Sequence, residues 1–71
     1  MRIRVSDPAR LRQLSLFFSF DPDSYVRVTG EDELEIWFVN SRDAWAQLAE
    51  AELRLRHWME WNRDVITVLI P

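Results

Sequence analysis

The chain contains no cysteine and no lysine, and it has only one glycine and one histidine in 71 residues. The lack of cysteine excludes disulfide bonds, thiolate metal sites and thiol catalysis. No apolar run approaches the roughly 18 residues that a membrane-spanning helix needs. The chain begins on a strand pattern at 2–5 instead of a basic and then apolar leader. We therefore expect a cytoplasmic protein that makes no membrane contact.

What the chain does contain is apolar and aromatic: 48% of its residues are hydrophobic, with four Trp and four Phe. This supply is generous for so short a chain, and residues 1–71 are expected to fold as a single domain. The formal net charge is −3, and the acids concentrate between residues 21 and 40. An excess of negative charge argues against a general polyanion binder.

The first half of the chain reads as a strand, a helix and a second strand. Apolar and charged residues alternate over 2–5, which indicates a half-buried strand. The segment Ser6-Asp7-Pro8 supplies a helix cap and an N-terminal proline, and Leu11, Leu14 and Phe18 then follow at helical spacing. Asp21-Pro22-Asp23 ends that helix in a turn.

A hairpin follows, with alternation over 25–29 and again over 34–39. The single glycine, Gly30, stands in the loop between these strands and is predicted to adopt a positive φ. A second helix is predicted from a cap at Asn40-Ser41 to about Asn62, and its core side is formed by Ala44, Leu48, Ala51, Leu55, Trp58 and Met59. A dense β-branched run over 65–70 is expected to form the last strand.

The element order β-α-β-β-α-β predicts an α+β protein with a ferredoxin-like split βαβ fold. The expected sheet is antiparallel in order 4-1-3-2, with both helices on one face. In this arrangement Ile66, Val68 and Ile70 of the last strand face the helices, together with the apolar residues of the other strands.

The opposite sheet face would stay bare, and two kinds of residue are expected there. Arg2 and Arg4 would meet Glu33 and Glu35 across neighbouring strands. An apolar band would form the interface with a partner, and its residues are Tyr25, Trp37, Val39, Val65 and Leu69. The last strand carries no protective charge, so homodimerisation is expected through this bare face or through an edge strand. Another protein partner remains an alternative occupant.

No constellation for catalysis or for a cofactor stands out. His57 and Glu60 share a helix face, but no nucleophile or further metal ligand accompanies them. The acidic residues at 21–23 and 31–33 fit turn chemistry. We expect no enzymatic activity, no metal and no cofactor.

The charged first strand, the central hairpin and the helix segment Ala51–Trp58 resemble small uncharacterised ferredoxin-like proteins of high-GC actinobacteria. The resemblance covers nearly the whole chain and implies a small protein of this fold without assigned chemistry. The predicted function is that of a non-enzymatic interaction or regulatory module that homodimerises.

Two alternatives stay open. One is a small-ligand-binding regulatory domain, similar to the amino-acid-binding ACT-like domains, with a site between subunits; the segment 6–8 lacks the glycine that their turn uses. The other is a weak RNA binder that stacks bases on Tyr25 and Trp37. Glu33 and Glu35, on the same strand as Trp37, would repel phosphates, so nucleic-acid binding is the less favoured expectation.

Overall fold

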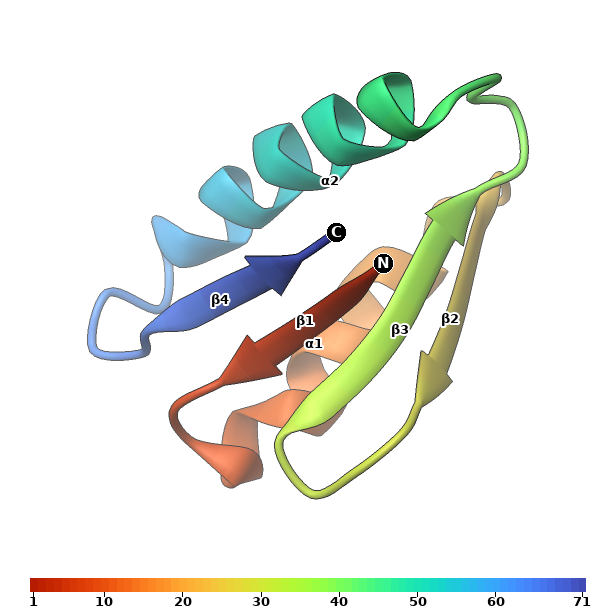
Figure 1. Ribbon diagram of the computed structural model, residues 1–71. Helices are drawn as coiled ribbons and strands as arrows, with labels where there is room; N and C mark the ends of the chain where they lie inside the picture. The colour runs from red at the N-terminus through yellow and green to blue at the C-terminus, as the bar shows by residue number, and fades with distance from the viewer.

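A computed structural model describes residues 1–71, which form a four-stranded antiparallel sheet and two α-helices (Figure 1). The strands are β1 (Arg2–Val5), β2 (Ser24–Val28), β3 (Glu33–Phe38) and β4 (Thr67–Ile70). The helices are α1 (Leu11–Ser19), preceded by a 3₁₀ turn at Pro8–Arg10, and α2 (Ala44–Met59). The order β2-β3-β1-β4 confirms the predicted arrangement of strands.

The core lies between the sheet and the two helices. Alternate residues of β1 and β3, among them Ile3 and Ile36, are fully buried on one face of the sheet. The apolar sides of both helices join them in a single cluster, which contains Leu11, Leu14 and Phe18 of α1 and Ala51, Leu55 and Trp58 of α2. Figure 1 shows α1 behind the sheet, so the nearer sheet face is the open one. Neither helix is long and apolar enough to cross a membrane.

The 3₁₀ turn and α2 begin at aspartate caps, whereas α1, which follows the 3₁₀ turn, has no side-chain cap of its own. Asp7 Oδ1 accepts a hydrogen bond from the amide of Ala9 at 3.1 Å, ahead of the 3₁₀ turn. Asp43 Oδ1 accepts from the amide of Ala46 at 2.7 Å and starts α2. The predicted cap at Asn40-Ser41 is therefore wrong. An aspartate whose carboxylate accepts the first free amides also suits the positive N-terminal end of the helix.

The hairpin between β2 and β3 is confirmed, but its glycine does not play the predicted role. Val28 pairs with Leu34, and the amides of Thr29 and Gly30 both donate to Glu33 O. Gly30 does not have a positive φ. The connection is long enough to turn without a left-handed residue, so glycine is not required by the backbone there.

The last strand is shorter than predicted and faces the other way. Leu69 lies opposite Ile3, and Thr67 opposite Val5, so both residues point toward the helices. Val65, just before the strand, is only 1% exposed and belongs to the core. The predictions that Val65 and Leu69 lie on the bare face and that Ile66, Val68 and Ile70 face the helices are wrong. Thr67 is accommodated on the helix side because its hydroxyl lies 3.7 Å from Met59 Sδ, a weak acceptor.

Candidate functional site

The centre of the open sheet face is occupied by ion pairs. Glu33 lies between two arginines, with Arg4 at 3.3 Å and Arg2 at 3.6 Å. Glu35 instead pairs with Arg27 of β2 at 3.2 Å. The predicted cross-strand positions are confirmed, because Arg2 lies opposite Glu35 and Arg4 opposite Glu33. Both arginines nevertheless form their ion pairs with Glu33. Exposed pairs of this kind contribute about 0.2–1 kcal/mol each to the free energy of unfolding. They therefore determine the polarity of this face more than the stability of the fold.

The aromatic part of the predicted interface lies at the β2–β3 side of the sheet. The rings of Tyr25 and Trp37 are cross-strand neighbours and stack with centroids 4.0 Å apart and planes 17° from parallel. Val39 follows β3 and is exposed, and its amide donates to Asp23 O at 2.8 Å. Three of the five predicted residues therefore gather in one corner of the molecule.

The other two predicted interface residues are not on that face, because Val65 is core and Leu69 points toward the helices. Their place is taken by Ile66, Val68 and Ile70, whose parity puts them on the open side. Ile66 is 69% exposed and Val68 is 52% exposed. An apolar row therefore exists on the last strand, displaced by one residue from the predicted set.

The row lies beside an unpaired strand edge. The amide of Ser6 donates to Ile66 O at 2.8 Å, which turns the backbone groups of Ile66 toward β1. Because these groups alternate along an antiparallel strand, the N–H and C=O of Thr67 and Leu69 face away from β1, toward the free edge. No residue over 65–71 is charged. The opposite edge strand, β2, carries Arg27.

A shallow groove of about 450 Å³ runs between α2 and β4 along this free edge. Its apolar floor includes Leu55, Met59 and Leu69, and its helical wall carries Glu52 and Arg56. These two opposite charges lie one helical turn apart and are exposed. The edge of β4 is therefore apolar, with one acidic side chain, Glu52, and one basic side chain, Arg56, beside it.

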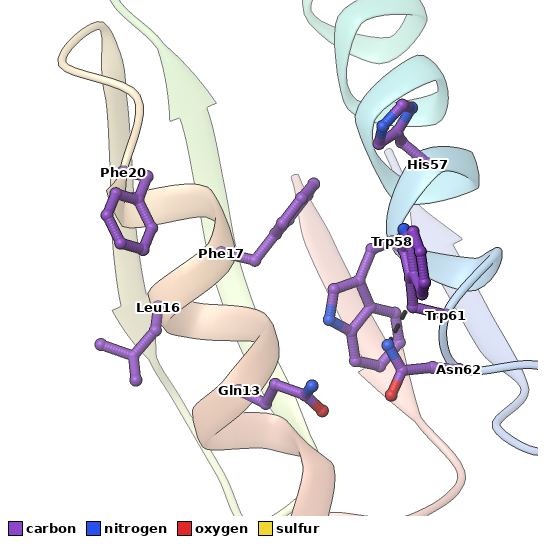
Figure 2. Close-up of a pocket in the computed structure, with 8 residues that line it drawn as sticks. All are labelled: Gln13, Leu16, Phe17, Phe20, His57, Trp58, Trp61 and Asn62. Carbon is purple, nitrogen blue, oxygen red and sulfur yellow. Dashed lines mark hydrogen bonds between the residues drawn. The ribbon is translucent and has the colours of Figure 1, made fainter.

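A second groove, of about 530 Å³, lies between the two helices. Figure 2 shows Phe17 and Gln13 projecting from α1 into the gap, with the ring of Trp58 between the helices. Trp58 is 3% exposed, and its Nε1–H is buried without an acceptor. His57 is exposed at this groove. Helical spacing marks Trp58 only as a core residue, so the unpartnered donor could not be predicted from the pattern.

A third cluster gathers around Arg54, whose guanidinium contacts Asp21, Asp23 and Glu50 and lies 4.6 Å from the centre of the Phe38 ring. A side-chain hydrogen bond between the two aspartates lowers the pKa of Asp21 and raises the pKa of Asp23. No three His, Asp or Glu side chains are arranged to hold a metal ion. This cluster ties the turn after α1 to the middle of α2.

Comparisons with protein-family models, with curated proteins and with solved structures found no match for this chain. The resemblance to actinobacterial proteins therefore stays a prediction.

Proposed function

We propose that this chain is a non-enzymatic interaction module of ferredoxin-like topology that forms a homodimer by pairing the β4 edges of two copies. The observation that carries the proposal is the free edge of β4, which has no charge and an exposed apolar row beside it. Natural proteins protect such edges with charge, proline or a covering segment, and only Pro71, beyond the end of the strand, offers anything of that kind.

The register of the pairing follows from the direction of the backbone groups. Thr67 and Leu69 direct their hydrogen-bonding groups outward, so a two-fold axis at Val68 pairs Thr67 with Leu69 of the second copy. Val68 then faces its own equivalent in a non-hydrogen-bonded pair, where the two Cα atoms lie about 4.5 Å apart. The contact is isologous, as most homodimer contacts are.

Both sides of the joined sheet gain from this register. On the open face, Ile66 meets Ile70 of the second copy, and the two short apolar rows become one continuous strip. On the helical side, the two α2 helices approach one another along the groove between α2 and β4 of each copy. Glu52 and Arg56 have opposite charges on each copy, so the two-fold axis can bring unlike charges together.

Association through the open face is less well supported than association through the edge. Its centre holds Arg2, Arg4, Arg27, Glu33 and Glu35, and covering them would remove paired charges from water. The desolvation of buried ion pairs commonly cancels their attraction. Edge pairing leaves those charges in solvent. It joins backbone groups along the edge and apolar side chains on the open face.

Two valines provide a matched test, because Val68 on β4 and Val28 on β2 are each 52% exposed on an edge strand. Val68→Lys introduces a charge at the proposed two-fold axis and should give a monomer with an unchanged circular dichroism spectrum. Val28→Lys introduces the same charge at the other edge and should leave the dimer intact. Sedimentation velocity across micromolar concentrations measures both. A monomeric wild-type protein, or dissociation caused by Val28→Lys alone, contradicts the proposal.

A further inference from the structure

The side chain of Trp58 carries an unmet hydrogen-bonding requirement. Its indole N–H is fully shielded from water, and no protein atom accepts a hydrogen bond from it. Buried tryptophan N–H groups nearly always have an acceptor, because burial removes the water that would otherwise accept the bond. The unpartnered donor therefore indicates a place where an acceptor from outside the protein would be favoured.

The ring that carries this donor lies in the lining of the groove between α1 and α2. Figure 2 shows the nitrogen-bearing edge of Trp58 turned toward α1, where Phe17 and Gln13 form the facing wall. Asn62 is the other buried polar residue of the lining, and its side chain already has hydrogen-bond partners. Its amide nitrogen donates to Trp58 O at 3.0 Å, and its oxygen accepts from Arg10 at 2.8 Å.

The walls of the groove can open without moving the backbone. Gln13, Leu16 and Trp61 are exposed, and the side chain of Gln13 makes no hydrogen bond within the protein. Rotation of such side chains is fast and meets little resistance. A volume of about 530 Å³ lies within the range of small-molecule pockets.

The lining also restricts the chemistry of an occupant. Five of its eight residues are hydrophobic, and none carries a carboxylate. The polar groups at the groove are able to donate hydrogen bonds: Trp58, His57 and Gln13. An apolar molecule that ends in an acceptor meets both requirements. A carboxylate is the strongest such acceptor, since hydrogen bonds to an ionised group are stronger than neutral ones.

We propose that the groove between α1 and α2 binds a small monocarboxylate with an aliphatic or aryl body, whose carboxylate accepts the Trp58 indole hydrogen bond. The apolar body packs on Phe17 and Leu16, under Trp61. No residue of β4 lines this groove, so the site does not depend on the proposed dimer.

The test uses the full chain labelled with ¹⁵N and titrated with octanoate, with the four indole N–H resonances as readout. The Trp58 resonance, assigned from its loss in Trp58→Phe, should move downfield and saturate. The Trp45 resonance, from the far end of α2, should stay in place. Octylammonium, with the same body and the opposite charge, should bind at least tenfold more weakly. No shift at millimolar octanoate, or equal responses to both amphiphiles, overturns the proposal.

Two surface leucines provide variants that do not disturb the core. Leu16 is 56% exposed and lines the groove, whereas Leu53 is 64% exposed on α2 and does not. Leu16→Glu places a carboxylate at the site and should weaken octanoate binding at least tenfold, while Leu53→Glu should leave it unchanged. Equal losses in both variants contradict the proposal. So does an upfield shift of the Trp58 resonance in unliganded Gln13→Leu, because Gln13 would then already satisfy the donor.

Discussion

Arg10 donates a hydrogen bond to the side-chain oxygen of Asn62 across 52 positions of sequence, at 2.8 Å. The same guanidinium pairs with Asp64 at 2.9 Å. Asn62 is buried, and its amide nitrogen donates a hydrogen bond to the backbone oxygen of Trp58. The start of α1 is thus held to the end of α2 by one buried amide that uses both its donor and its acceptor.

Asn62→Ala should therefore destabilise the fold. It removes the Asn62 donor from the Trp58 carbonyl, which keeps the amide of Trp61, and it removes one acceptor from Arg10. The expected cost of losing these two hydrogen bonds is about 1–3 kcal/mol in the free energy of unfolding. Urea denaturation measures it. Asn40→Ala is the control, because Asn40 is exposed and its side chain makes no hydrogen bond. Equal stabilities of the two variants would contradict this role of Asn62.

Gly30→Ala should stabilise the protein. Gly30 does not have a positive φ, and a Cβ built there meets only Glu33 Cβ at 3.9 Å, an ordinary van der Waals contact. Alanine restricts the unfolded chain more than glycine does, so a gain of about 0.4–1 kcal/mol is expected. Thermal and urea unfolding test it. A clear destabilisation would mean that the loop requires glycine after all.

Asp23→Asn should change the pH dependence of stability. The hydrogen bond from Asp21 raises the pKa of Asp23 in the folded state, so the stability that its protonated form contributes is lost as pH rises through that raised value. Asparagine keeps an uncharged polar group at every pH. The variant should therefore gain stability relative to wild type as pH rises through the acid range.

Denaturation at several pH values, with Asp64→Asn as control, measures this difference. Asp21 acts in the opposite direction, because its lowered pKa makes its contribution present above the unfolded value and lost as pH falls through the folded one. An advantage of Asp23→Asn that grows on acidification would refute the assignment.

Trp37→Glu distinguishes a dimer that forms through the β4 edge from one that forms through the open face of the sheet. The change removes the stack on Tyr25, which is worth about 0.5–1.5 kcal/mol beyond simple burial, and should leave the fold and the β4 dimer in place. Sedimentation velocity and circular dichroism check both points. Monomers from Trp37→Glu would move the interface to the β2–β3 corner, and an unfolded product would make Trp37 a core residue.

Much of the fold could be predicted because its patterns are unambiguous. The strands of the hairpin alternate charged and apolar residues, so Leu34 and Ile36 could be assigned to the core, where both are buried. The arginines of β1 reach Glu33 because strand order and parity follow from that same alternation. Where polar residues mark one face of a strand, the sequence determines the side that each residue occupies.

The orientation of β4 could not be predicted in this way. Residues 65–70 are apolar on both parities except for Thr67, and polarity alone assigns a threonine to the bare face. In the structure the hydroxyl of Thr67 is met by Met59 Sδ, and register with Ile3 and Val5 decides the orientation. The unpartnered N–H of Trp58 could not be predicted from the sequence either. Helical spacing places a side chain on the core side without fixing the direction of its polar edge.

The difference between the two outer strands of the sheet would limit how large the proposed assembly can become. A copy that joins through β4 uses its only uncharged border, and the sheet of the pair ends on both sides at a β2 strand that carries Arg27. In the proposed dimer a third molecule would therefore find no bare border on which to add, and growth would stop at a closed pair instead of continuing into a fibre.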